Sequence, residues 1–280
     1  MTLEELYQEG IHKLEASKIA EARLDAWYLL ESITGVSRGL YILHRSDVME
    51  PETVDAYQSL IAKRAERIPL QYILGEQEFM GISFLVNEHV LIPRQDTEIL
   101  VEQVLKAAKE LPYAPDVLDM CTGSGCILIS IASLTRVNQA VGADCSKEAL
   151  DVAKKNGQRS HVEAMWLESN LFENVTGTYD ILTSNPPYIP TSVIGTLEPE
   201  VKDHEPWLAL DGAEDGLAFY RRMGKQAGKY LKPGGQIFLE IGCEQAAEVC
   251  HILQENEYTE IRVTKDYSGL DRVVSARKKS

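Results

Sequence analysis

The chain has 280 residues, of which 44% are hydrophobic, and its formal net charge is −15. This composition is typical of one large folded domain, or of a main domain with a smaller one, and it excludes a disordered chain. The acidic balance argues against tight, sequence-independent binding of nucleic acid, which requires lysine and arginine to neutralise phosphates. No apolar run approaches the roughly 20 residues that span a bilayer, and the acidic N-terminus lacks a signal-peptide pattern. We therefore expect a cytoplasmic protein that does not associate with membranes.

The cysteines and histidines do not suggest a metal site. The five cysteines are odd in number and include no C-x-x-C pair, and the six histidines show no helical metal-ligand spacing. Reduced thiols in a cytosolic protein explain this pattern most simply. We predict no bound metal.

The first part of the chain is predicted to form a helical bundle. Apolar residues recur at three- and four-residue spacing in 3–16, 20–33 and 51–68. Pro69 ends this region, and alternating apolar residues in 70–93 predict two short strands around Asn87-Glu88. We predict an N-terminal helical domain at residues 1–70, a β-hairpin linker at 71–93 and a third region at 94–280.

The third region begins with an amphipathic helix that Asp96 or Thr97 can cap. Strand-like and helix-like runs then alternate, with Ser146 as a plausible helix N-cap. The predicted strands are 116–120, 139–144, 162–169, 179–185, 236–241, 258–266 and 272–277. Seven strands with interleaved helices predict an α/β fold with a mostly parallel, doubly wound sheet. The last two strands have no helix between them, so we expect one of them to be an antiparallel edge strand.

A glycine turn follows the first strand of this predicted sheet. Gly123 and Gly125 let backbone N–H groups approach a ligand at a helix N-terminus, although a plain strand–helix turn has the same composition. The turn is not G-x-G-x-x-G, and no Walker lysine follows it, so phosphate binding is disfavoured.

Two further polar residues follow the next strands. Asp144 ends the second strand and can accept both ribose hydroxyls of an adenosine, or else cap a helix. Asn170 follows the third strand, where its carbonyl can accept the adenine amino group. Leu171 and Phe172 can flank the ring.

The fourth strand runs into Asn185-Pro186-Pro187-Tyr188, a rigid corner unless it is only a Pro-Pro turn. Together with the glycine turn and Asp144, this tetrapeptide resembles the S-adenosylmethionine-dependent methyltransferases that act on a nitrogen conjugated to a π-system. Asn185 Oδ1 and the Pro186 carbonyl can each accept one N–H of the target NH₂, which fixes the nitrogen toward the methyl group. Tyr188 can stack on the flat target.

The chain as a whole resembles the HemK/PrmC family of protein-glutamine N5-methyltransferases, which modify peptide chain release factors. The segments that carry the resemblance are 92–98 (IPRQDTE), 185–190 (NPPYIP), 205–221, 231–235 (LKPGG) and 266–277. The resemblance implies a Rossmann-like class I methyltransferase fold. It also implies that S-adenosyl-L-methionine, converted to S-adenosyl-L-homocysteine, methylates the glutamine of a Gly-Gly-Gln motif. The N-terminal helical domain and the hairpin would hold a class 1 release factor, and we expect a monomer that does not bind nucleic acid directly.

The resemblance also implies site residues. The cofactor would contact Asp119, Cys121, Thr122, Gly123, Ser124, Gly125, Asp144, Cys145, Asn170, Leu171 and Asn185. The substrate would contact Arg94, Glu98, Asn185, Pro186, Pro187 and Tyr188, of which Asn185, Pro186 and Tyr188 would be catalytic. Arg94 and Glu98 have an alternative role as an exposed salt bridge at a helix start. The chain departs from the family pattern where Cys121 replaces a glycine and Gln95 replaces a proline.

Other functions stay open on the sequence alone. The Asn-Pro-Pro-Tyr corner also suits methylation of an exocyclic amine in nucleic acid, although a base modifier would carry a basic footprint. Methylation of a glutamine in a ribosomal protein is a nearer alternative. A non-catalytic binding module is a third, against which the intact set of glycines, Asp144 and Asn185 argues.

Overall fold

The computed structural model describes residues 1–279, and its contacts divide the chain into two compact units. The first unit is Met1–Gly75 together with Glu198–His204, and the second contains the remaining residues. Most of the segment 71–93, predicted as a linker, therefore belongs to the second unit. Within residues 1–279, no helix is both long and apolar enough to cross a bilayer.

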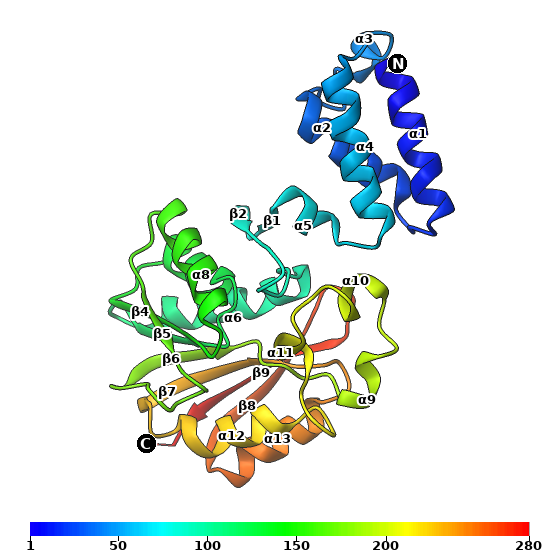
Figure 1. Ribbon diagram of the computed structural model, residues 1–280. Helices are drawn as coiled ribbons and strands as arrows, with labels where there is room; N and C mark the ends of the chain where they lie inside the picture. The colour runs from blue at the N-terminus through cyan, green and yellow to red at the C-terminus, as the bar shows by residue number, and fades with distance from the viewer. Residues whose placement is uncertain (280) are drawn as a thin grey trace. The chain divides into compact units, whose positions relative to one another are not determined.

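The first unit is a helical bundle, as predicted. Its helices are α1 (Leu3–Ala16), α2 (Ala22–Thr34), α3 (Tyr41–His44), α4 (Pro51–Ala65), α5 (Leu70–Leu74) and the short α10 (Pro199–Lys202) (Figure 1). Thr2 and Glu5 form a reciprocal capping box at the start of α1, and Pro51 occupies the first turn of α4. The apolar stripes of α1, α2 and α4 pack into one core that includes Leu6, Trp27 and Ile61.

A buried ion cluster attaches α10 to this bundle. Arg64 of α4 is only 7% exposed, and its guanidinium contacts Asp25 Oδ2 at 2.7 Å and Glu200 Oε1 at 2.9 Å. Arg67 contacts the other oxygen of Glu200 at 2.6 Å. Burial raises the pKa of Asp25 although Arg64 opposes the shift. The cluster explains why residues 198–204, which are flanked on both sides by the second unit, group with the first.

The predicted hairpin exists, but the predicted position of its turn was wrong. Strand β1 (Glu76–Phe79) pairs with β2 (Ile82–Leu85), and the turn between them is Met80-Gly81, not Asn87-Glu88. Both turn residues have positive φ, 52° and 74°, which is the two-residue geometry that matches strand twist. The apolar alternation misled the prediction because Val86, Val90 and Ile92 are buried in an irregular segment outside any strand.

The second unit contains the predicted seven-stranded sheet, in the order β5-β4-β3-β6-β7-β9-β8. The strands are β3 (Asp116–Met120), β4 (Gln139–Asp144), β5 (Met165–Glu168), β6 (Tyr179–Ser184), β7 (Leu231–Glu240), β8 (Tyr258–Lys265) and β9 (Asp271–Lys278). Strands β3 to β7 are mutually parallel. As expected, one of the last two strands, β8, is an edge strand with antiparallel pairing. Its partner is β9, which is also antiparallel to β7 and inserts between β7 and β8.

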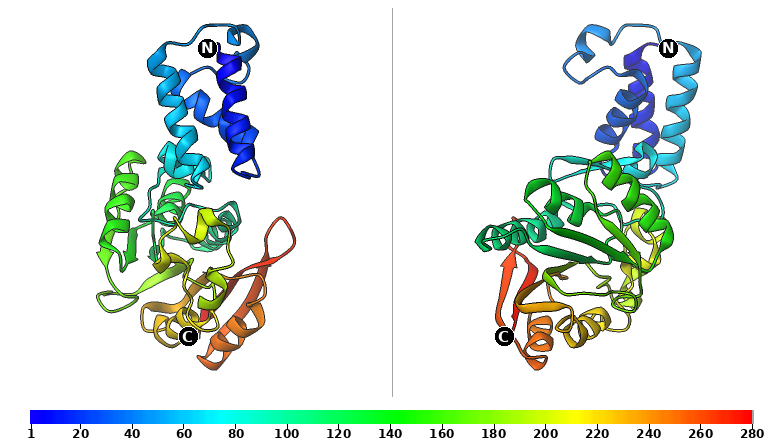
Figure 2. Two further views of the ribbon diagram at one scale, coloured as in Figure 1. Left: turned by 45° about the vertical axis from the view of Figure 1, so that its right-hand side comes forward. Right: turned by 90° about the vertical axis from the view of Figure 1, so that its left-hand side faces the viewer.

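Helices cover both faces of this sheet. In Figure 1, α6 (Glu98–Glu110) and α8 (Lys147–Arg159) lie on one face, and α12 (Ala218–Ala227) and α13 (Ala246–Glu255) on the other. Figure 2 shows β8 and β9, in orange and red, at the end of the sheet away from the green strands β4 and β5. Successive strand residues alternate between the two cores, as Val117 and Leu118 do, which is why these strands are apolar throughout.

The remaining helical elements lie in the connections. They are the 3-10 turn η1 (Gln95–Thr97), α7 (Cys126–Leu134), α9 (Thr191–Ile194) and α11 (Trp207–Leu210). Ser146 caps α8 as predicted, since its hydroxyl accepts from the Ala149 N–H at 3.1 Å. Thr97 occupies the N-cap position of α6 but makes no side-chain cap there. Because β3, β4, β5 and β6 are parallel, the loops that leave their carboxyl ends meet at one edge of the sheet.

Candidate active site

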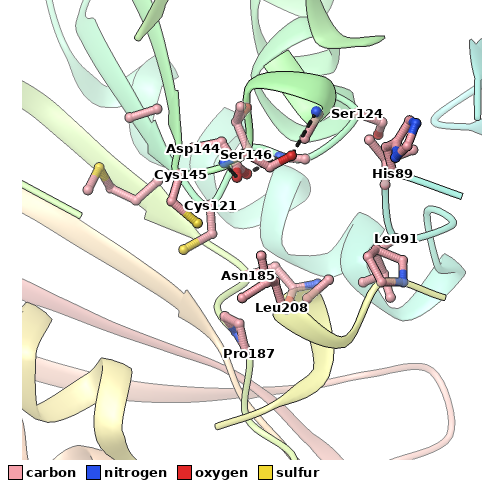
Figure 3. A pocket seen from close by; sticks show the side chains of 18 of the residues that line it. His89, Leu91, Cys121, Ser124, Asp144, Cys145, Ser146, Asn185, Pro187 and Leu208 are labelled. Atoms are coloured by element: carbon pink, nitrogen blue, oxygen red, sulfur yellow. Dashed lines mark hydrogen bonds between the residues drawn. The ribbon is translucent and has the colours of Figure 1, made fainter. Parts of the chain in front are cut away.

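A cavity of about 600 Å³ opens at this carboxyl edge. The predicted site residues that line it are Arg94, Cys121, Thr122, Gly123, Ser124, Asp144, Cys145, Asn170, Leu171, Asn185 and Pro187. Figure 3 shows Asp144 grouped with Cys145 and Ser146, and Asn185 grouped with Pro187 and Leu208. The cavity therefore joins the predicted cofactor residues to the proline corner.

The glycine turn owes its shape to two positive φ angles. Gly123 and Gly125 have φ of 54° and 78°, which side chains disfavour. Gly125 is also the N-cap of α7, and a Cβ there would meet Trp166 and Ile129 at 3.0 Å. The turn closes through a hydrogen bond from the Gly125 N–H to the Thr122 carbonyl at 2.8 Å.

A buried carboxyl group holds the turn in place through hydrogen bonds. Asp119 is fully buried, and its two oxygens accept the hydroxyls of Thr122 at 2.6 Å and Thr183 at 2.7 Å. Burial raises the pKa of Asp119 to about 7, although the two hydroxyls oppose the shift. Asp119 does not line the cavity, and it positions the turn through Thr122, whose side chain is 3% exposed.

Asp144 is held in the cavity wall by the backbone. Its Oδ2 accepts the Gly123 N–H at 2.9 Å and its Oδ1 accepts the Ser146 N–H at 3.0 Å. Burial raises its pKa, and the backbone hydrogen bonds partly compensate. Each carboxylate oxygen keeps a further lone pair, so the group can still accept hydrogen bonds from a ligand.

Cys121 stands in a backbone conformation that normally selects glycine. Its φ is 57°, in the left-handed region, so the family's glycine at this position has a conformational reason. The thiol of Cys121 packs partly against the core, and burial raises its pKa strongly. Cys145 is exposed and lines the same cavity. Burial and the neighbouring charge of Asp144 raise the pKa of the Cys145 thiol as well.

The segment after β5 only partly matches the expectation. Asn170 lines the cavity, but its Oδ1 already accepts from Arg222 at 3.0 Å and its Nδ2 donates to Glu173 at 3.0 Å. Leu171 also lines the cavity. Phe172 does not, because its ring is buried and stacks on Tyr230 with centroids 4.7 Å apart.

Asn185 follows β6 directly and faces the cavity. Ser184 anchors the strand end by donating to the Met120 carbonyl at 2.7 Å. The Asn185 Nδ2 donates to Thr97 Oγ1 at 3.3 Å, which leaves its Oδ1 available. Pro187 lines the cavity, whereas Pro186 does not.

Tyr188 is placed differently from the stacking position that we expected. Its ring packs against the core instead of lining the cavity, and burial raises its pKa to about 12. Its carbonyl accepts from Gln245 Nε2 at 3.0 Å. A Cβ on Gly212 would meet the Tyr188 backbone at 2.8 Å, so the corner is closely packed from behind.

The predicted pair Arg94 and Glu98 separates in the structure. Arg94 lines the cavity and contacts both carboxylate oxygens of Glu205 at 2.6 and 2.7 Å. Glu98 is absent from the cavity lining, and it accepts the Met80 N–H at 2.7 Å, which stabilises the hairpin turn. Neither the substrate-lining role of Glu98 nor an ion pair between Arg94 and Glu98 matches this geometry.

Sequence reasoning missed two buried residues behind Asn185. Thr97 is 2% exposed and accepts the Asn185 amide, and Glu240 is 1% exposed at the end of β7. Thr97 was considered only as a helix cap. Glu240 could have been found, because it ends a strand that pairs with β6 in the same parallel sheet. Among residues 1–279 there is no group of three or more histidine, cysteine or acidic side chains that could hold a metal ion.

The fold and the cavity define a Rossmann-like methyltransferase. A family model described as methyltransferase small domain matches residues 95–195. A solved methyltransferase from Pyrococcus furiosus is 15% identical and covers 80% of this chain and 98% of that chain with a TM-score of 0.52. At that identity the likeness supports the fold alone.

The relatives specify the family. A model described as PrmC N-terminal domain matches residues 5–75. The release factor glutamine methyltransferase of Geobacter sulfurreducens is 42% identical over 261 residues, which are 92% of this chain and 90% of that protein. That of Agrobacterium fabrum is 36% identical over 271 residues, covering 95% and 94%. The chain belongs to the release factor glutamine methyltransferase family.

Proposed function

We propose that this protein transfers a methyl group from S-adenosyl-L-methionine to the side-chain amide nitrogen of the glutamine in the Gly-Gly-Gln motif of class 1 peptide chain release factors. The observation that carries the proposal is that Asn185 and Asp144 line one cavity, with the glycine turn between the elements that bear them. Membership of the family supplies the target, and translation termination places the reaction in the cytoplasm.

The residues on one side of the cavity fit the cofactor. Asp144 is fixed by two backbone N–H groups and keeps lone pairs for a pair of ribose hydroxyls. Gly123 brings backbone close to the cavity without a side chain, and Leu171 and Phe219 add apolar surface for a flat ring. When bound, the cofactor supplies a methyl group on a positively charged sulfur. The acidic, partly buried wall at Asp144 also suits a cationic ligand.

Asn185 prepares the target nitrogen on the other side. An amide nitrogen is a poor nucleophile because its lone pair is delocalised into the carbonyl. Asn185 Oδ1 can accept one of its N–H groups, which orients the nitrogen and favours the positive charge that develops on it. The second acceptor in this proposal is the backbone carbonyl of Pro186, a residue between Asn185 and Pro187 that does not itself line the cavity. Pro186 and Pro187 restrict the backbone φ angles, so these acceptors do not swivel. The proton then becomes acidic, and no strong general base is required.

The first unit is proposed to hold the release factor. Its α3 region exposes apolar side chains, with Ile42, Leu43 and Val48 each more than 70% exposed. Exposed apolar groups that gather in one short segment are typical of protein interaction surfaces. We expect the enzyme to act as a monomer.

The test incubates the protein with methyl-labelled cofactor and purified class 1 release factors, either wild type or with the Gly-Gly-Gln glutamine changed to alanine. Label should appear on the wild-type factor only. Equal labelling of both factors would refute the proposed target. A parallel reaction with ribosomal proteins and with RNA covers the two alternative acceptors, and preferential labelling of either would replace the release factor as the substrate.

A further inference from the structure

The carboxyl group of Glu240 lies directly behind the proline corner. Strands β6 and β7 pair in parallel with Ser184 opposite Leu239, so Asn185 and Glu240 are the next residues on neighbouring strands. Glu240 is 1% exposed, and its Oε2 is buried with no hydrogen-bond partner among residues 1–279. A buried carboxyl with an unused oxygen is costly to the fold, so its presence beside Asn185 calls for a function.

Thr97 connects Glu240 to Asn185. The hydroxyl of Thr97 accepts the Asn185 Nδ2–H at 3.3 Å. Both side chains lie close enough to the Glu240 carboxyl to lower its pKa, as donors to the carboxylate do. A hydroxyl has one proton to give, and an ionised carboxylate can only accept. Glu240 therefore takes the proton of Thr97, and the Thr97 oxygen presents a lone pair to Asn185.

These directions of hydrogen bonding, from Asn185 to Thr97 and from Thr97 to Glu240, determine which end of the Asn185 amide faces the cavity. With the amide turned over, Asn185 Oδ1 would face the lone pairs of Thr97 and the acceptor-only carboxylate of Glu240. That arrangement loses the hydrogen bond and places like partial charges together in a buried site. The NH₂ end is thus held on the side of Thr97 and Glu240.

We propose that Glu240 is a positioning residue that, through Thr97, keeps Oδ1 of Asn185 turned toward the cavity. The catalytic consequence rests on the proposed function, because it requires Oδ1 to accept an N–H of the target amide. The orientation itself does not depend on the identity of the substrate.

The charged and titratable groups around Glu240 allow the carboxyl to change state near neutral pH. Burial raises its pKa to about 7. The groups that interact with it are Arg272, which favours the carboxylate, Asp96, which opposes it, and the side chains of Tyr188, Tyr220 and Cys126. Above the pKa, Glu240 can only accept, so Thr97 donates to Glu240 and Asn185 donates to Thr97. Below the pKa, the protonated Glu240 can itself donate to Thr97. Thr97 can then donate to Asn185, so the amide is no longer held in one orientation.

Four substitutions test the proposal in the methyl-transfer assay at about pH 8.5. Glu240→Gln and Thr97→Val should each lower kcat at least about tenfold while the Kd for S-adenosylmethionine stays within about twofold. Thr97→Ser, which retains the hydroxyl, should keep kcat within about threefold of wild type. The matched control is Glu255→Gln, whose side chain is 64% exposed on α13 and which should be unaffected.

Stability separates a positioning role from a structural one. Glu240→Gln removes a buried charge at nearly constant shape, so the thermal midpoint should stay the same or rise while kcat falls. In the wild type kcat should fall as the pH drops below about 7, and Glu240→Gln should lack this part of the profile. A Glu240→Gln enzyme with kcat within about twofold of wild type, or one whose loss of kcat merely follows a loss of folded protein, would overturn the proposal.

A second measurement does not require activity. The side-chain ¹⁵N–¹H resonances of Asn185, assigned by their absence in Asn185→Ala, should shift as the pH passes about 7 in the wild type but not in Glu240→Gln. Resonances that do not respond to pH in the wild type would overturn the orientation. A wild type that shows this shift yet labels no release factor would refute the proposed function and leave the orientation standing.

Discussion

Carboxyl groups at the two edges of the parallel sheet have opposite environments: those at the amino edge are paired with a cation, and those at the carboxyl edge are not. At the amino edge, Lys232 contacts Asp116 at 2.6 Å and Asp180 at 2.7 Å, and Asp180 also accepts from the Asp116 N–H and from Tyr113. Burial alone would raise the pKa of Asp180, but these donors outweigh it, and the pKa is lowered. Every charge there has a partner, which is what folding requires.

At the carboxyl edge the balance is reversed. Asp119 and Glu240 are buried, no lysine or arginine hydrogen-bonds to either side chain among the described residues, and the pKa of each is raised to about 7. Their partners are hydroxyl and amide groups that themselves face the cavity or lie directly behind it. Among the described residues, these two buried carboxyls without a hydrogen-bonded cation lie beside the proposed ligand site, where rigid hydrogen-bond acceptors are needed.

The largest expected effect is on catalysis at the carboxyl edge. Asn185→Ala removes the oxygen that is proposed to hold the target amide, and we expect kcat to fall about 10²–10³-fold, as when one hydrogen-bonding group is lost from a pre-organised site. Calorimetry should find cofactor binding nearly unchanged. Full turnover by the variant would contradict the role given to Asn185.

A smaller effect is expected on cofactor binding. Asp144→Asn removes a charge whose hydrogen bonds are each worth about 1.5–3 kcal/mol, so the Kd for S-adenosylmethionine should rise about 10–100-fold. Calorimetry measures the Kd directly. Asp151→Asn, on the exposed side of α8, is the matched control. Equal affinity in the two variants would exclude Asp144 from the cofactor site.

The amino edge should respond in stability and not in catalysis. Lys232→Met leaves two carboxylates without their shared cation, and we expect the free energy of unfolding to fall by about 1–3 kcal/mol, as measured by urea denaturation. Lys229→Met, at an exposed position just before β7, the strand that carries Lys232, should change it by less than about 0.5 kcal/mol. Identical urea midpoints for the two variants would show that the cluster at Lys232 is not stabilising.

Changing the pH should affect folding stability in opposite directions at the two edges. The pKa of Asp180 is lowered in the folded state, so its contribution is present above the unfolded pKa of about 3.9 and is lost as the pH falls below it. The pKa of Glu240 is raised, so the folded state binds more protons, and stability falls as the pH rises from about 4 to 7. Urea unfolding midpoints should be measured from about pH 3 to 8. Between about pH 4 and 7, the midpoint should fall less in Glu240→Gln than in the wild type. Parallel curves would contradict this assignment.

The smallest effect is expected at the glycine turn. Cys121→Gly relieves a left-handed φ that costs roughly 1 kcal/mol, but it loses the packing of a partly buried thiol and adds freedom to the unfolded chain. The free energy of unfolding should change by less than about 1 kcal/mol, again measured in urea. A larger stabilisation would mean that the thiol packing contributes little.

The sequence by itself determined the class of fold and which polar strand ends meet at one edge of the sheet. Alternating apolar runs specify strands and helices locally, and in a parallel sheet every strand end that carries a polar residue is brought to one edge. Asp144, Gly123 and Asn185 could therefore be placed together without coordinates, and all three line the cavity.

Only the tertiary structure decided which side chains face the cavity and which support it. The Met80-Gly81 turn, the insertion of β9 inside the sheet, and the turning of Tyr188 into the core all depend on packing between segments distant in the chain. The same holds for Glu240 and Thr97, which lie about 140 residues apart in sequence yet both lie beside the side chain of Asn185. Local patterns report periodicity and turn chemistry, whereas the partner of a buried polar group is set by the surfaces that close around it.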